Sequence, residues 1–267
     1  MRNRSTVTVW TSVFVIALAT LAVAHPSLGE QQSAEFDPRD FSGYWMGDTP
    51  RNNDPPPLTP AGLAMMEGRV PDYLTTLPNE SNDPMYMCNP QGFPRLAWEE
   101  NEPIEFIHTR DRVIQHFQWE RTLRELWMDG RELPSGENLD NLGPTWYGHS
   151  VAEWEGDTLV VRTTGLDERA WIDEYANPTG FDALIEERYT RTGVNTIEGR
   201  LVINDPKNYT APWEPLPTIF RRLPEDDVNY FGWKGLFSGI TEAICAPMNE
   251  LGDFNIRIRD PGIFGAN

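Results

Sequence analysis

From residue 104 onward, apolar and polar residues alternate with a period of two through most of the chain. This alternation is typical of β-strands that turn one face toward a core. Turn dipeptides such as Arg110-Asp111 and Gly156-Asp157 divide the pattern into short runs. Together with an earlier run at Gly43, the pattern predicts strands at 43–45, 104–109, 112–119, 122–128, 147–154, 158–164, 183–191, 196–204 and 217–223.

Successive strands with short connections favour an all-β fold, an antiparallel meander. An open meander exposes two strand edges, and closing it into a barrel removes them. We therefore predict a barrel, with 217–223 as the last, edge strand. The hairpin across Gly156-Asp157 is predicted to lie at the centre of the sheet, with Leu159 and Val161 on one face and Val160 on the other.

Residues 47–103 hold eleven of the 23 prolines, which excludes a continuous sheet there. One short helix is predicted at 61–69, because Thr59 is a good N-cap and Pro60 suits the first helical position. The remainder is expected to be an ordered, Pro-rich wrap around the barrel, because its aromatic and Met content favours packing. A flexible linker between two domains is the alternative.

The N-terminus resembles a secretory signal. Arg2 and Arg4 precede an apolar run at 7–21, and Ala22-Val23-Ala24 fits a cleavage site, so residues 1–24 are predicted to be a signal peptide. A retained membrane anchor is the alternative, but the run carries several Thr and Ser residues. The sequence thus predicts a periplasmic or secreted protein without stable membrane insertion after cleavage. Residues 25–38 are expected to be disordered, and 39–267 to form one barrel domain that includes a C-terminal tail at 224–267.

The chain is acidic, with a net charge of −19, and removing the two arginines of the signal leaves −21. Nucleic acids and anionic membranes require basic patches, so neither is an expected partner. The chain has two cysteines, Cys88 and Cys245. In the oxidising compartment predicted for an exported protein, such a pair usually forms a disulfide. Two free thiols or a metal site are the alternatives, and the lack of close histidine partners disfavours the metal.

His149 is the leading candidate for proton transfer, because imidazole titrates nearest to neutral pH. Tyr147 and Glu187 would be its partners if their strands converge. The competing interpretation is a histidine that bonds the sheet or packs in the core and performs no chemistry. His108 and His116 lie on neighbouring predicted strands, but no metal-binding spacing accompanies them, so no metal is predicted.

Common catalytic signatures are absent from the sequence: it holds no Gly-x-Ser-x-Gly elbow, phosphate loop, dinucleotide fingerprint or Cys-x-x-Cys. Ser-His-Asp hydrolysis is therefore unsupported, and no cofactor is predicted.

Several sequence blocks between residues 88 and 215 resemble a large family of uncharacterised secreted bacterial proteins. They are Cys88-x-Pro-x-Gly-x-Pro-Arg95, Asp129-Gly130-Arg131, Pro144-Thr145-Trp146-x-Gly148-His149-Ser150, Trp154-Glu155-Gly156-Asp157-Thr158-Leu159-Val160-Val161, Trp171-Ile172-Asp173, Glu187-Arg188-Tyr189 and Asp205-Pro206-Lys207-x-Tyr209. The resemblance implies an exported β protein and carries no established reaction. Gly43-x-Trp45 and the strand order more distantly resemble lipocalin-like barrels, in which such a Trp closes one end.

Three functions follow as hypotheses. The leading one is a periplasmic barrel that binds a small, largely apolar or aromatic molecule in its cavity, with Trp146, Tyr189, Arg131 and Trp171 as candidate ligand contacts. The second is a cofactor-free lyase, isomerase or hydratase that uses His149 as its acid-base residue. The third is a structural envelope protein with a filled core.

Overall fold

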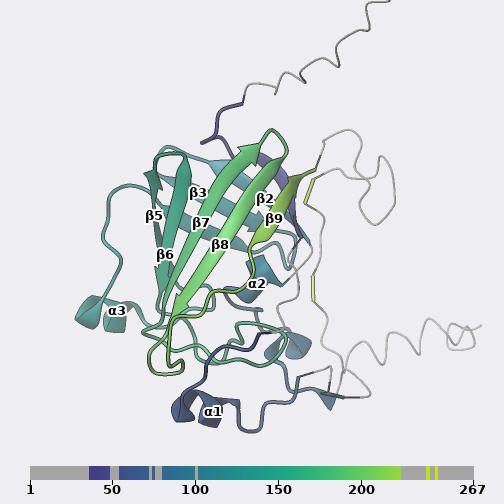
Figure 1. Cartoon of the computed structure of the whole chain (residues 1–267), viewed down its shortest axis with the longest axis vertical. Coiled ribbons are helices and arrows are strands. Elements are labelled where there is room, and N and C mark those ends of the chain that lie inside the picture. The colour runs from purple at the N-terminus through teal and green to yellow at the C-terminus, as the bar shows by residue number, and fades with distance from the viewer. Residues whose placement is uncertain are drawn as a thin grey trace, which may run out of the picture. The chain divides into compact units, whose positions relative to one another are not determined.

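Nine strands close into one barrel in sequence order, as Figure 1 shows with β5–β9 in front and β2 and β3 behind. The computed structural model describes residues 36–48, 54–71, 74–75, 80–99, 102–223, 239–240 and 244–245. The strands are β1 (Gly43–Asp48), β2 (Pro103–His108), β3 (Arg112–Phe117), β4 (Leu123–Trp127), β5 (His149–Glu155), β6 (Thr158–Thr164), β7 (Leu184–Gly193), β8 (Thr196–Asn204) and β9 (Thr218–Arg222). The predicted all-β barrel is confirmed.

Barrel closure makes β9 an interior strand, so the prediction of an edge strand at 217–223 is wrong. On one side β9 pairs with β8, through Thr196 and Arg221, and on the other with β1, through Trp45 and Arg222. Trp45 is fully buried, and the guanidinium of Arg222 lies 5.4 Å from the centre of its ring. The first and last strands are therefore joined by side-chain stacking as well as by backbone hydrogen bonds.

One pair departs from the predicted antiparallel meander: β4 and β5 run parallel. The central hairpin behaves as predicted, because β6 lies between β5 and β7 and its Leu159, Val160 and Val161 are all buried. Burial on both faces of β6 agrees with a two-sided, central strand.

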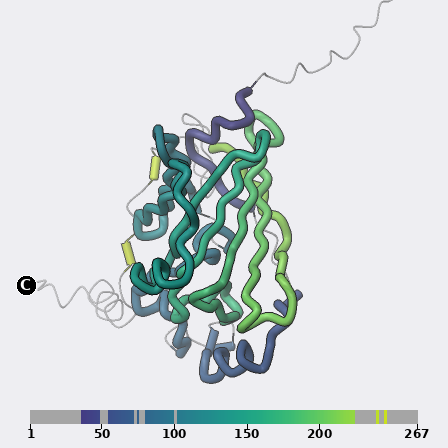
Figure 2. Tube along the Cα trace, turned by 90° about the vertical axis from the view of Figure 1, so that its left-hand side faces the viewer, coloured from purple at the N-terminus to yellow at the C-terminus, as the bar shows by residue number. Residues whose placement is uncertain are grey.

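The structure contains more helices than the one that was predicted. Helix α1 (Pro60–Met66) confirms that prediction, with the Gly62 N–H donating to the Thr59 hydroxyl at 3.0 Å, and it stops short of residue 69 near Gly68, which has a left-handed φ of 81°. Helices α2 (Arg95–Trp98) and α3 (Gly136–Leu142) and the 3₁₀ turn η3 (Pro84–Met87) were not predicted. In Figure 2, α1 and the neighbouring loops lie below the strands.

Among the described residues, side chains from the strands and from the wrap pack together in the barrel interior. Every residue from 91 to 98 is buried, and α2 inserts Trp98 among the inward-facing aromatics. The ring of Trp98 lies 5.8 Å from that of Tyr189 and 6.3 Å from that of Phe220, and the Tyr189 ring lies 5.8 Å from that of Phe106. These spacings are those of attractive aromatic packing, so α2 acts as a plug of the barrel.

Three predictions concern residues that the structure describes in part or not at all. The signal peptide at 1–24 lies outside the described residues, as does the predicted disordered stretch 25–38 except for residues 36–38. Of the tail at 224–267, residues 239–240 and 244–245 are described.

Candidate functional site

The β4–β5 junction is the least continuous part of the barrel wall. A single parallel bridge, Trp127 to Val151, joins these strands, whereas every other neighbouring pair is antiparallel over four or more positions. Parallel neighbours require a long crossover, which residues 128–148 provide with α3 inside it. Away from this bridge, the facing edges of β4 and β5 share no ladder pair among the described residues, and the side chain of Arg124 spans the joint by donating from Nη2 to Ser150 Oγ at 3.1 Å.

A pocket of about 430 Å³ follows this junction between the wall and the crossover. Its lining comes from β4, from the crossover, which contributes Tyr147, and from the start of β5, which contributes His149. Two exposed leucines border it, Leu123 at 60% exposure and Leu142 at 58%. The volume lies within the range of small-molecule sites, which begins at roughly 300 Å³.

His149 is half-buried at the start of β5, on the outer face of the wall. Its Nε2 lies 2.9 Å from the Gly143 carbonyl oxygen. A carbonyl only accepts, so Nε2 carries a proton in this hydrogen bond. In the neutral ring Nδ1 is then an acceptor, and among the described residues it has no hydrogen-bond partner.

Two glycines allow close packing around the start of β5, one beside the imidazole and one beside the end of β6. A Cβ on Gly165 would lie 2.7 Å from His149 Cδ2, and a Cβ on Gly148 would lie 2.8 Å from the Thr164 carbonyl oxygen. Both glycines have left-handed φ angles, 75° and 67°. The Gly-His-Ser block therefore needs its glycine so that β5 can begin close against the end of β6.

Tyr147 also lines this pocket. Its hydroxyl lies 3.3 Å from the hydroxyl of Thr122, the residue before β4. Burial raises the pKa of Tyr147 to about 12, so the phenol is protonated at neutral pH. Tyr147 can serve there as a hydrogen-bond donor.

Arg131 belongs to the pocket rim and is already paired. Its guanidinium stacks 3.7 Å from the centre of the Trp127 ring, and its Nη2 lies 2.6 Å from Asp129 Oδ2. The hydrogen bond that Arg131 donates to the Asp129 carboxylate raises the pKa of Arg131. Arg112 covers Trp127 as well, at 4.4 Å, so the indole is held between two cations.

Glu187 and Tyr189 lie on the inner face of the wall, away from the His149 pocket. Arg124 donates from Nη2 to Glu187 Oε1 at 2.6 Å and from Nη1 to Oε2 at 2.9 Å, and the Tyr189 hydroxyl donates to Oε2 at 2.7 Å. Burial raises the pKa of Tyr189 well above its usual value. The predicted convergence of His149, Tyr147 and Glu187 is therefore realised only for the first two.

Sequence reasoning missed Arg124, the partner of Glu187. It is buried, and its Nη2 also donates to Ser150 Oγ at 3.1 Å and to Thr163 Oγ1 at 2.7 Å. The available signal was an arginine at an inward position of an alternating strand, between Thr122 and Leu126.

Trp146 and Trp171 lie apart from this pocket. Arg169 stacks over Trp146 at 5.0 Å, and Arg69 over the buried Trp171 at 5.7 Å. A second pocket, of about 460 Å³, lies on the other side of the α3 end and includes Arg169 and Phe181 in its lining. The four predicted ligand contacts therefore do not form one site. Arg131 lines the pocket at the β4–β5 junction (the junction pocket), Tyr189 lies in the barrel interior, and Trp146 and Trp171 lie outside the junction pocket.

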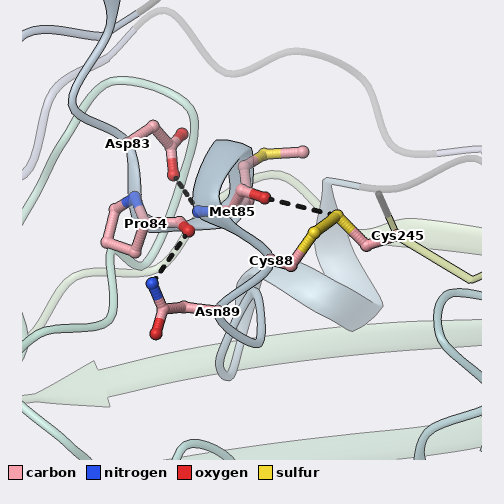
Figure 3. The surroundings of a disulfide bond; sticks show 6 residues. All are labelled: Asp83, Pro84, Met85, Cys88, Asn89 and Cys245. Atoms are coloured by element: carbon pink, nitrogen blue, oxygen red, sulfur yellow. Dashed lines mark hydrogen bonds between the residues drawn. A yellow bond between two sulfur atoms is a disulfide. The ribbon is translucent and has the colours of Figure 1, made fainter. Parts of the chain in front are cut away.

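The predicted disulfide is confirmed: Cys88 and Cys245 are bonded, with their Cα atoms 5.6 Å apart (Figure 3). The two histidines considered for a metal do not face each other. His108 Nε2 accepts from the Phe41 N–H at 3.2 Å, whereas His116 Nδ1 lies 3.2 Å from Glu105 Oε2 on the other face.

Comparisons with protein-family models, with curated proteins and with solved structures found no match. The resemblance to a secreted bacterial family and to lipocalin-like barrels thus stays a prediction. Within the described ranges, no helix is both long and apolar enough to cross a membrane.

Proposed function

We propose that this chain is an exported protein that binds a small molecule in the β4–β5 junction pocket. The observation that carries the proposal is the pocket of about 430 Å³ at the one parallel joint of the wall, with His149 and Tyr147 in its lining. Export is proposed from the N-terminal signal pattern and is supported by the disulfide, which persists in oxidising compartments.

The junction pocket replaces the barrel interior as the proposed place of the ligand. In the described interior, Trp98 and its aromatic neighbours pack on one another, and the Arg124–Glu187 pair occupies the polar part. A ligand in the interior would have to displace the α2 plug. A ligand in the junction pocket meets exposed leucines and displaces no described core side chain.

The polarity of the rim favours a neutral ligand with an apolar body. Arg131 is paired with Asp129, Glu125 with Arg112 at 3.2 Å, and Arg124 with Glu187, so three of the charges that line the pocket are compensated, while Glu132 adds one exposed carboxylate. Leu123 and Leu142 offer apolar surface, while Tyr147 and the His149 ring offer hydrogen bonds. This combination suits a small amphipathic or aromatic molecule with a hydrogen-bonding group.

The test is native mass spectrometry of the protein purified from the periplasm of its own source. We expect a small-molecule adduct that Leu142→Glu removes, because a charge at the rim opposes apolar contact. Leu216→Glu is the matched control, since Leu216 is also exposed, at 46%, and does not line the pocket. An adduct that survives Leu142→Glu contradicts this location, and a protein without any adduct favours the structural envelope role with a filled core.

A second candidate function is acid-base catalysis in the same pocket. It is favoured by the proton on His149 Nε2, which leaves Nδ1 as a base, and by the protonated Tyr147 phenol as a donor. Once an adduct is identified, its turnover by the wild type and by His149→Gln separates the two functions. Unchanged turnover in His149→Gln contradicts the catalytic role, whereas a bound but unreacted molecule supports binding alone.

A further inference from the structure

The imidazole of His149 presents its two edges to different parts of the molecule. The edge formed by Cδ2 and Nε2 faces Gly165 and the end of α3. A Cβ on Gly165 would lie 2.7 Å from Cδ2 and 3.3 Å from Nε2, and Leu139 of α3 borders the same position at 2.9 Å. The Gly143 carbonyl oxygen lies 2.9 Å from Nε2. The edge that His149 leaves to the junction pocket is therefore the one that carries Nδ1.

The hydrogen bond to Gly143 determines what Nδ1 can do. Because Nε2 donates to a carbonyl oxygen, the proton of the neutral ring is on Nε2, and Nδ1 holds a lone pair. Nδ1 accepts no hydrogen bond from the described part of the chain. His149 is half-buried, and a partly desolvated acceptor without a donor is unfavourable. A ligand that supplies the donor removes this cost.

Two other half-buried polar side chains of the pocket can take either hydrogen-bonding role. The Tyr147 hydroxyl lies 3.3 Å from the Thr122 hydroxyl, and either oxygen can donate in that pair. Thr145 is held by its backbone, whose N–H donates to the Gly165 carbonyl oxygen at 2.9 Å, while its hydroxyl is able to rotate. Because hydroxyls adapt to a donor or to an acceptor, neither of these residues selects between the two kinds of ligand.

The charged side chains of the pocket also contribute little to this selection. Arg131 and Glu132 are exposed, so water competes for their hydrogen bonds. Arg124 uses both of its Nη atoms for partners that include Glu187 and Ser150, and its Nε is buried. Selection between donor and acceptor ligands therefore depends on His149.

We infer that the ligand of the junction pocket carries an O–H or N–H donor on its apolar body, and that His149 Nδ1 accepts this hydrogen bond. The inference rests on the proposed small-molecule function. The class that fits is a neutral alcohol, phenol or aromatic N–H compound. An ether or ketone of the same shape would place an oxygen lone pair against the lone pair of Nδ1, which leaves both acceptors unpaired.

Indole and benzofuran provide the test, because they have nearly the same shape and differ in one ring position. Indole has an N–H donor there, whereas benzofuran has an oxygen that can only accept. The affinity of each compound for the purified protein at neutral pH is measured by ligand-observed NMR titration. We expect wild type to bind indole about fivefold more tightly than benzofuran, the ratio that one net hydrogen bond gives.

Variants and a nitrogen resonance assign the preference to His149. His149→Leu removes the acceptor and should make the two affinities equal, whereas Glu132→Gln, a change at an exposed pocket residue, should leave their ratio unchanged. In wild type, indole but not benzofuran should shift the Nδ1 resonance of His149, which is identified by its absence from the spectrum of His149→Gln. This measurement does not require His149→Leu to fold.

The possible results separate the donor requirement from the proposed pocket. Equal affinity of wild type for the two compounds, with both weakened by Leu142→Glu and not by Leu216→Glu, overturns the donor requirement and leaves the pocket in place. An indole preference that persists in His149→Leu, or an Nδ1 resonance that indole does not shift, overturns the role of His149. If neither compound binds, or if Leu142→Glu weakens neither, the proposed pocket is contradicted and the inference fails with it.

Discussion

Glu99 ends the α2 plug, and its ionisation should make the stability of the barrel depend on pH. Burial, together with the nearby carboxylates of Asp173 and Glu174, raises the pKa of Glu99 from 4.5 to about 7, and Arg95 offsets this only in part. An acid with a raised pKa holds its proton more tightly when folded than when unfolded. The contribution of Glu99 to the free energy of unfolding is therefore most favourable below pH 4.5, and it is lost as the pH rises to about 7.

The magnitude follows from the shift from 4.5 to about 7, which corresponds to about 3 kcal/mol at 1.36 kcal/mol per pH unit. Glu99→Gln keeps an acceptor for the Glu174 N–H and removes the charge. We expect the variant to be more stable than wild type at pH 8, and its advantage there to exceed that at pH 5 by about 2 kcal/mol.

Urea unfolding at pH 5 and pH 8 measures this difference, with Glu132→Gln as the control at an exposed position. The reasoning is refuted if Glu99→Gln changes the free energy of unfolding equally at both pH values, or if it destabilises the protein at pH 8. Either result would mean that Glu99 is solvated or is compensated by Arg95 in the folded state.

Three further perturbations test the interior, the disulfide and the pocket. Arg124→Met should lower the free energy of unfolding, measured in urea, by about 3–5 kcal/mol, because it leaves the buried Glu187 carboxylate without its ion-pair partner. Adding Glu187→Met should recover most of this loss. An equal loss in the single and the double variant would contradict the prediction. Cys88→Ser/Cys245→Ser should lower the unfolding free energy by about 5 kcal/mol in the chain-entropy model for a separation of 157 residues, and thiol titration of denatured, unreduced wild type should find no free thiol. His149→Ala should lower the free energy of unfolding by only about 1 kcal/mol, the value of one hydrogen bond, and should abolish the adduct or its turnover. A larger loss of stability with ligand binding unchanged would show that the role of His149 is structural.

Strand positions were predictable because alternation is a local property. All nine predicted runs correspond to strands, with boundaries that differ by a few residues, as in β1, which continues to Asp48, and β3, which ends at Phe117. The missed helices are short: α2 covers only Arg95–Trp98, and such a turn has too few residues to show a helical period. Helix α3 begins after Ser135 and ends before Gly143, which are boundary signals, but seven residues between them show little periodicity.

The direction of strand pairing was not predictable from alternation. A strand alternates identically beside a parallel or an antiparallel neighbour, and the connection between β4 and β5 decides the matter. Alternation also does not determine which face of a strand points into the barrel, and this affected the candidate site. Alternation placed His149 and Val151 on one face and Glu187 and Tyr189 on one face, but it cannot say which face is inside. The structure places the first pair outside and the second inside.

The junction pocket is a consequence of the parallel joint. The chain must return over the wall to start β5 in the direction of β4, and the returning segment leaves a hollow beside strand edges that share one bridge. Three consecutive residues then serve three different surfaces. Gly148 permits the close start of β5 against β6, His149 turns outward to the pocket, and Ser150 turns inward to Arg124. A change in this tripeptide therefore alters wall, pocket and interior together, and its separate effects can be distinguished only by variants that change one surface at a time.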